Sequence, residues 1–177
     1  TDFDGIGDKN ADINDDGEIQ INEAQQIINL KIDSQKIVSL QGIGHFINLE
    51  NLDCSYNSLK QLNLNKLVKL EDLNCTYNLI SELTIGANLK LKNLNCSNNK
   101  LAKLNLQNNT KLISLSCSKN KLIKLNLEGI ILLKHIDCIE NKLKTLNIKG
   151  LNNLEELYCY INKLTKLNLE GLSNLQY

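Results

Sequence analysis

The sequence predicts an α/β-solenoid that is mostly β, in which short coils stack to give a parallel sheet on one face and short extended segments on the opposite face. Two observations predict this fold class. Six cysteines recur at intervals of 21 residues: Cys54, Cys75, Cys96, Cys117, Cys138 and Cys159. The pattern around each resembles that of residues 91–111, which read LxxLxCxxNxLxxLxLxxNxx. A fixed period of about 20–50 residues is typical of repeat architectures, whose coils bury their apolar side chains against neighbouring coils.

One leucine opens each coil, and these openings divide the chain into two parts. They are Leu49, Leu70, Leu91, Leu112, Leu133 and Leu154, and a last coil begins at Leu175 and is cut at Tyr177. A less regular coil precedes them, beginning at Ile27 and lacking the cysteine and the asparagine. We expect an acidic loop and capping helix over residues 1–29 and a solenoid over residues 27–177. Because the chain stops inside a coil, we expect it to be a piece of a longer protein.

The spacing within one coil predicts which side chains point inward. Leu94 and Cys96 are two residues apart, as on the buried face of a strand, and Asn95 between them then points outward. Leu101, Leu104 and Leu106 repeat this spacing and predict a second extended segment on the opposite wall. Coils stacked at the strand separation of about 4.8 Å would form a parallel sheet.

Two further columns of polar or sulfur-containing residues follow the same period. One asparagine per coil lies where the chain turns, and we expect its amide to satisfy backbone groups that face the interior (Asn57, Asn78, Asn99, Asn120, Asn141 and Asn162). The cysteines occupy a position that holds Ile32 in the first coil, which favours small buried free thiols. Disulfides or a metal site are the alternatives, although parallel Cβ vectors and the lack of a CxxC pair disfavour both.

The N-terminus is acidic and contains a calcium-loop motif. Residues 1–30 hold eight acidic side chains against Lys9, a net charge of −7, whereas the whole chain has a net charge of zero. The stretch 12–23 matches the EF-hand loop, with Gly17 at the sharp turn and calcium ligands at Asp12, Asn14, Asp16, Glu18 (through its carbonyl) and Glu23. A helix would follow over residues 22–29, with an apolar face at Ile27 and Ile28. The alternative is an acidic turn that caps the solenoid and binds no ion.

The repeated coils resemble the leucine-rich-repeat family, whose signature is LxxLxLxxNxL. The closest pattern is that of the short 21-residue bacterial class, in which cysteine replaces the third leucine. An acidic loop followed by such coils also resembles the calcium-loop caps of bacterial surface proteins of this family. The resemblance implies a right-handed solenoid that binds a protein or glycan partner, a bound Ca²⁺, and a secreted or cell-surface location.

The solvent-facing side of the predicted sheet is the candidate partner-binding face. Its central column is Asp53, Asn74, Asn95, Ser116, Asp137 and Tyr158. A flanking column, Ser55, Thr76, Ser97, Ser118, Ile139 and Tyr160, is expected to face solvent as well, with Tyr56 and Tyr77 one residue further on. Tyrosine is enriched at interfaces, so the candidate face comprises the central column with Tyr56, Tyr77 and Tyr160. An ordinary polar surface is the alternative.

Several function classes are disfavoured. Ser114, His135 and Glu156 form an outward row of catalytic residue types, but nothing supplies a strained nucleophile turn or an oxyanion hole, so we predict no enzymatic activity. The chain has no Arg and its lysines fall at turns, for example Lys100, Lys121, Lys142 and Lys163, which disfavours a nucleic-acid partner. No apolar run is long enough to span a membrane. A passive spacer, or an accessory domain of a larger enzyme, remain alternative roles.

Overall fold

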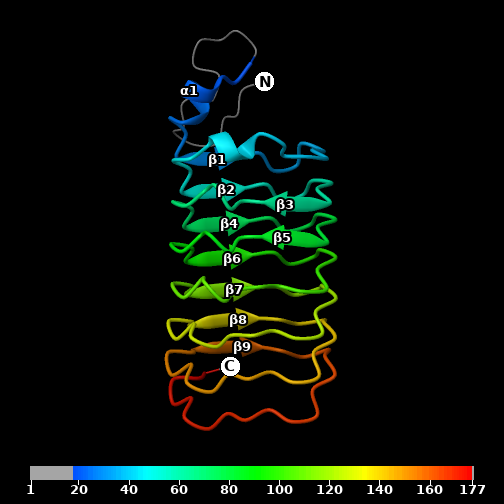
Figure 1. Ribbon diagram of the computed structural model, residues 1–177. Helices are drawn as coiled ribbons and strands as arrows, with labels where there is room; N and C mark the ends of the chain where they lie inside the picture. The colour runs from blue at the N-terminus through cyan, green and yellow to red at the C-terminus, as the bar shows by residue number, and fades with distance from the viewer. Residues whose placement is uncertain (1–17, 177) are drawn as a thin grey trace.

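A parallel sheet of seven strands runs along the solenoid in the computed structural model, which describes residues 18–176 (Figure 1). Each coil contributes one strand, and the order is β1-β2-β4-β6-β7-β8-β9. The bounds are β1 Asn29–Lys31, β2 Asn51–Asp53, β4 Asp72–Asn74, β6 Asn93–Asn95, β7 Ser114–Ser116, β8 His135–Asp137 and β9 Glu156–Tyr158. The described chain is mostly β with almost no helix, which confirms the predicted fold class.

The strand register keeps the period of the sequence. Leu52 pairs with Leu73 and Leu73 with Leu94, an offset of 21 residues, whereas Leu30 pairs with Leu52 because the first coil has one residue more. Each coil therefore lays its residues over the matching residues of the coil before. Side chains that recur every 21 residues in the sequence form straight columns along the molecule.

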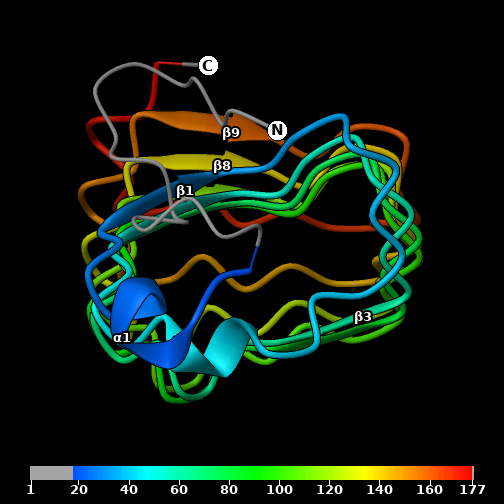
Figure 2. The ribbon, with the colours of Figure 1, turned by 90° about the horizontal axis from the view of Figure 1, so that it is seen from above.

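The opposite wall is less regular than the main sheet. β3 (Gln61–Asn63) and β5 (Glu82–Thr84) pair in parallel, and Figure 2 shows β3 facing the main sheet across the interior. In the later coils the corresponding segments carry no assigned strand, but their inward leucines, for example Leu104 and Leu106, are buried. The predicted extended segments thus include two paired strands, and packing of leucines holds the rest of this wall.

The N-terminal end differs from the expected helix. α1 spans only Ile21–Ala24, and a short 3-10 helix, η1, spans Ile43–His45 in the first coil. Ile27 is buried as expected, but Ile28 is 49 % exposed, so the predicted apolar pair is wrong at Ile28. The reason is that the carbonyl of Ile28 accepts the N–H groups of Glu50 and Asn51, which draws this segment into the sheet before the helix can continue.

The interior is filled by one stack of leucines, isoleucines and cysteines. Five cysteines are buried, Cys159 is half-buried, and all six are free thiols, as the sequence predicted. Burial raises the pKa of the Cys54, Cys96 and Cys138 thiols to about 12. They are therefore neutral at physiological pH and pack as small apolar side chains.

The asparagine column ties each turn to the coil before it. The Nδ2 group of Asn99 donates to the carbonyls of Cys75 (2.9 Å), Cys96 (3.1 Å) and Ser97 (3.2 Å). Its Oδ1 accepts the N–H of Ile80 at 2.9 Å. Asn78, Asn120, Asn141 and Asn162 repeat this arrangement. Asn57 does the same for the first coil, which has Gln35 in place of an asparagine at the matching position. The predicted structural role of this column is confirmed.

A second, shorter asparagine pair lies in the other half of the coil. Asn88 and Asn109 are completely buried, and the Nδ2 of Asn109 donates to the carbonyls of Ile85 (3.1 Å) and Asn88 (2.9 Å). The Oδ1 atoms of both residues have no hydrogen-bond partner. Neighbouring coils place Leu67 and Ile130 at this position, so an apolar side chain also fits there.

The two asparagine columns allow a matched test. We predict that Asn99→Leu lowers the free energy of unfolding by about 3 kcal/mol, because several buried backbone groups lose a partner. Asn109→Leu has the same shape change, but the carbonyls of Ile85 and Asn88 also accept backbone N–H groups. It also removes an unsatisfied oxygen, so we expect a change of less than about 1 kcal/mol. Urea unfolding of both variants measures the two changes in the free energy of unfolding. Equal losses of stability in the two variants would contradict the different roles of the two asparagine columns.

Candidate functional site

Two columns of side chains cover the solvent face of the main sheet. The central column is Lys31, Asp53, Asn74, Asn95, Ser116, Asp137 and Tyr158, and the upstream column, two residues earlier in each strand, is Asn29, Asn51, Asp72, Asn93, Ser114, His135 and Glu156. A shallow groove of about 550 Å³ lies between them over β1, β2, β4, β6 and β7. Polar side chains line it, with leucines of the same strands at its floor.

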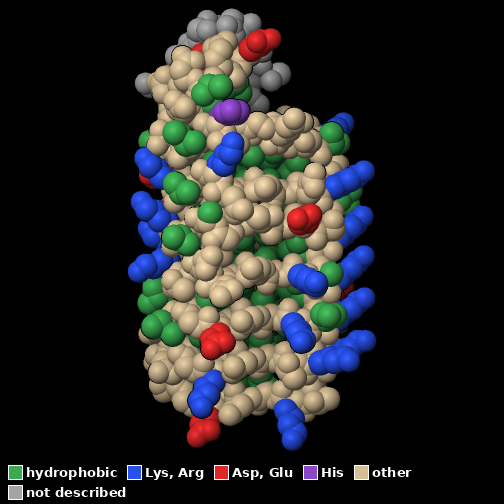
Figure 3. All heavy atoms as spheres, in the orientation of Figure 1, with side chains coloured by type: hydrophobic (Ala, Val, Ile, Leu, Met, Phe, Trp, Pro, Cys, Tyr) green, Lys and Arg blue, Asp and Glu red, His purple; other side chains and the backbone are tan. Residues whose placement is uncertain are grey.

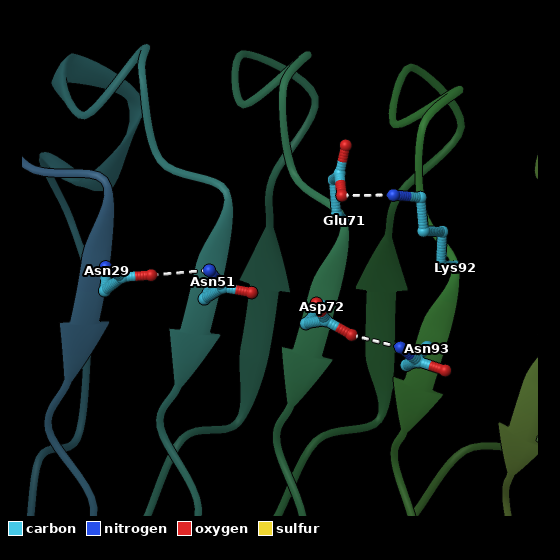
Figure 4. Close-up of polar contacts among 6 residues, drawn as sticks. All are labelled: Asn29, Asn51, Glu71, Asp72, Lys92 and Asn93. Atoms are coloured by element: carbon cyan, nitrogen blue, oxygen red, sulfur yellow. Dashed lines mark hydrogen bonds and ion pairs between the residues drawn. The ribbon is translucent and has the colours of Figure 1, made fainter.

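The upstream column also belongs to the site, although the predicted partner-binding face did not include it and only Ser114, His135 and Glu156 were predicted to point outward. Asn51 donates from Nδ2 to Asn29 Oδ1 at 2.5 Å, and the amide of Asn93 donates to the carboxylate of Asp72 (Figure 4). Beside them, the ammonium of Lys92 lies 2.5 Å from Glu71. These bonds run along the stack and fix the orientation of the polar groups that face the groove. The two-residue alternation of a strand was the signal that would have identified this column.

The central column faces outward as predicted, and each of its members is the last residue of a strand. Asp53 Oδ1 accepts the N–H (3.0 Å) and the hydroxyl (2.6 Å) of Ser55. Asn74 accepts the same two groups from Thr76, at 3.2 and 3.0 Å. Asn95 and Asp137 each accept the N–H two residues further on. These are Asx-turns, so the column combines a structural role with exposure to the groove.

The flanking column does not face solvent, contrary to the prediction. Ser55, Thr76, Ser97 and Ser118 are buried, Ile139 is half-buried, and only Tyr160 is well exposed. The chain leaves the extended conformation at the Asx-turn, so the alternation of inward and outward side chains ends one residue earlier than assumed. Of this column, only Tyr160 remains a candidate for partner contact.

A stacked tyrosine pair lies at the turn after β2 and β4. The rings of Tyr56 and Tyr77 are parallel within 9°, with centroids 4.4 Å apart, and about half of each side chain is exposed. Both residues have positive φ (52° and 51°), as do the matching residues of the next four coils, Asn98, Lys119, Glu140 and Ile161. This conformation is unfavourable for non-glycine residues, so the stacking of the coils imposes it. None of the four described tyrosines lines the groove, and Tyr56 and Tyr77 follow the lining residues Asp53 and Asn74 by three positions.

The Ser-His-Glu row is only partly assembled. His135 Nδ1 lies 2.8 Å from Glu156 Oε2, and its ring is tilted against that of Tyr158 at 5.7 Å. Ser114 is the register neighbour of His135, but the residues that the structure describes include no hydrogen bond between the two. The row lies on the open face of a sheet, where little water is excluded. It contains an acid–base pair without an activated nucleophile.

The predicted calcium ligands lie mostly outside the described residues. Asp12, Asn14 and Asp16 belong to that part of the chain, whereas Glu18 is exposed and Glu23 is 3 % exposed. Glu23 Oε2 accepts the N–H of Gln20 at 2.9 Å, at the start of α1. Within residues 18–176, no three His, Cys, Asp or Glu side chains cluster to hold a metal. Glu23 is the one charged side chain in the described core, and a buried carboxylate needs compensating partners.

Comparison with solved structures identifies the architecture. A leucine-rich-repeat protein of Leptospira interrogans is 27 % identical with a TM-score of 0.80, over 88 % of this chain and 43 % of that protein. YopM of Yersinia enterocolitica is 26 % identical with a TM-score of 0.70, over 85 % of this chain and 32 % of that protein. Internalin C2 of Listeria monocytogenes shares the fold at 22 % identity, with a TM-score of 0.65 and coverage of 89 % and 82 %.

These neighbours are bacterial leucine-rich-repeat proteins, and the solenoid described above has their fold. Their architecture suggests a protein-interaction module. The chain spans less than half the length of the Leptospira protein and about a third of YopM. No protein-family model matches the chain, and no curated protein matches its sequence. Residues 18–176 contain no helix long and apolar enough to cross a membrane.

Proposed function

We propose that the chain is a non-enzymatic binding module that holds a protein partner against the solvent face of its main sheet. The groove over β1, β2, β4, β6 and β7 carries this proposal, because two columns of oriented polar groups line it. Side chains such as Asn51 and Asn93 are already fixed by lateral hydrogen bonds. A partner therefore binds a preformed surface and loses little conformational entropy in ordering it.

The tyrosines would supply most of the contact energy. Tyr56 and Tyr77 expose aromatic surface beside the groove, and Tyr158 and Tyr160 lie at the far end of the same face. Tyrosine buries a large area and keeps a hydroxyl for hydrogen bonding, so it is common among the residues that dominate binding energy. The remaining candidates, Asp53, Asn74, Asn95, Ser116 and Asp137, would provide complementarity along the groove.

Other roles remain as alternatives to a protein partner. A glycan ligand would use the same polar groove, and an accessory domain of a larger enzyme would hold that enzyme's substrate there. A passive spacer would use neither the groove nor the tyrosines. The groove and the exposed tyrosine pair favour a binding role over a spacer.

A tyrosine variant tests the proposed face. Tyr56, Tyr77, Tyr158 and Tyr160 are replaced by Ser, and the matched control replaces the exposed Val68 and Leu89, which lie away from the groove. Partners captured by the parent protein are identified and purified, and their affinities for each variant are measured by calorimetry. We expect the tyrosine variant to bind at least tenfold more weakly, since loss of one such side chain costs about 1–2 kcal/mol or more. Unchanged binding by the tyrosine variant would support the spacer instead.

We further propose that residues 12–23 bind Ca²⁺ and cap the N-terminal end of the solenoid. The carboxylate-rich sequence of this loop supports it, and so does the burial of Glu23 next to the first coil. Asp12, Asn14, Asp16 and Glu23 would contribute side-chain oxygens and Glu18 its carbonyl, the hard ligands that Ca²⁺ prefers. Ca²⁺ at such a loop would neutralise carboxylates that otherwise repel one another. Such modules bind calcium at extracellular concentrations, which supports a secreted or cell-surface location in a bacterium.

Calorimetry with and without calcium tests the loop. We expect 1 mM Ca²⁺ to raise the melting temperature by on the order of 5 °C over EDTA, because an ion that binds only the folded state stabilises it by mass action. Asp12→Asn with Asp16→Asn should abolish this shift without touching the capping bond of Glu23 to Gln20. Mg²⁺ serves as the control ion. If calcium does not change the melting temperature of the parent protein, the alternative holds, in which the loop is an acidic turn that binds no ion.

A further inference from the structure

One edge of the solenoid carries a column of lysines that stack in register. The edge lies downstream of the main-sheet strands, at the turns that follow β6, β7, β8 and β9. Each turn presents a lysine at the matching position: Lys100, Lys121, Lys142 and Lys163. All four are exposed. Each backbone N–H donates to a carbonyl of the preceding coil at 2.8–2.9 Å, for example Lys121 to Leu101. The column is therefore held straight by the same bonds that hold the stack.

Further lysines broaden this column into a strip. The lysine strip consists of Lys100, Lys103, Lys119, Lys121, Lys124, Lys142, Lys144, Lys163 and Lys166, all exposed. Glu140 is the one acid in the same turns, and its carboxylate lies 4.0 Å from the Lys119 ammonium. Figure 3 shows lysine side chains gathered along the right-hand edge of the lower coils. In the sequence these lysines are separate turn residues, and stacking of the coils brings them together.

The upstream edge carries acids that pair with some of its lysines. Lys92 and Lys134 form ion pairs with Glu71 at 2.5 Å and Glu155 at 2.8 Å in neighbouring coils. In the lysine strip, by contrast, the ammonium groups of the four stacked lysines make no hydrogen bond or ion pair to any residue between 18 and 176. Like charges in register at the strand spacing of about 4.8 Å repel one another. An anionic ligand along the edge would relieve this repulsion.

We propose that the lysine strip binds a linear acidic polysaccharide that lies along the solenoid axis. A chain with acidic groups at regular intervals matches a column that offers one ammonium per coil. Carboxylate or sulfate groups suit lysine, which acts as a point charge and needs no bidentate geometry. This surface lies on an edge of the solenoid and not in the groove of the main sheet, so both can be occupied together.

The composition of the strip favours a polysaccharide over a nucleic acid. Residues 91–153 contain no Phe, Tyr or Trp, so along most of the strip no ring is present to stack on bases, which is how proteins bind single strands. The exposed ring of Tyr160, three residues before Lys163, is the exception. The chain has no Arg for bidentate contacts to phosphate.

Two charge-matched variants test the proposal. The strip variant carries Lys100→Gln, Lys121→Gln, Lys142→Gln and Lys163→Gln, and the control carries Lys66→Gln, Lys69→Gln, Lys90→Gln and Lys111→Gln on the upstream edge. The probes are polygalacturonate oligomers, heparin oligomers and an oligo-dT strand of equal charge, titrated at two salt concentrations. All eight lysines are exposed, so both variants should keep the melting temperature of the parent. A double variant of Lys121 and Lys142 replaces the strip variant if it unfolds.

We expect the parent to bind at least one of the two polysaccharides, with an affinity that falls as salt rises. The strip variant should bind at least tenfold more weakly and the control within twofold of the parent. If the strip variant and the control lose affinity equally, binding depends only on net charge, and the proposal is overturned. Failure of the parent to bind either polysaccharide would overturn it too. Tighter binding of oligo-dT, lost in the strip variant, would make the edge a nucleic-acid surface instead.

Discussion

The bond between an asparagine amide and the preceding coil is the interaction on which the rest of the structure depends. A chain that turns every few residues leaves carbonyls facing an interior filled with leucine, where no water can reach them, and such groups are costly when unpaired. One buried amide per coil, as at Asn99 or Asn120, satisfies two or three carbonyls and one N–H at once. Because these partners belong to two successive coils, the same side chain closes its own turn and fixes the register of the stack.

The functional surfaces follow from that register. Because matching residues lie directly over one another, a residue type that recurs at one position of the coil forms a column. The polar groups along the groove, the stacked rings of Tyr56 and Tyr77, and the lysine strip all arise in this way. The backbone takes part as well, since a left-handed conformation is imposed on Tyr56, Ile161 and the residues that match them. The stack holds these side chains in fixed positions, and their chemistry varies from coil to coil without disturbing the core.

The period of the sequence was sufficient to predict the solenoid, the inward leucines, the free thiols and the asparagine column, because each depends on spacing alone. It failed where a local hydrogen bond overrides spacing: the Asx-turn at Asp53 buries Ser55, and the sheet takes up Ile28 before the helix can extend. The lysine strip and the bonds between Asn51 and Asn29 were missed for another reason, since they join residues of neighbouring coils that are adjacent only after stacking. The calcium ligands Asp12, Asn14 and Asp16 lie outside the described residues and stay a prediction.

Amide hydrogen exchange tests the central claim most directly, because the chain offers two classes of the same bond. The N–H groups of Leu59, Ile80, Leu101 and Leu122 donate to a buried asparagine Oδ1 of the next coil, whereas those of Asn65, Gln107, Glu128 and Lys149 donate to an exposed asparagine Oδ1 two residues before. If the buried amides hold the stack, the first class should exchange as slowly as the strand amides, and the second should exchange faster by several orders of magnitude. Similar exchange rates in the two classes would contradict the account.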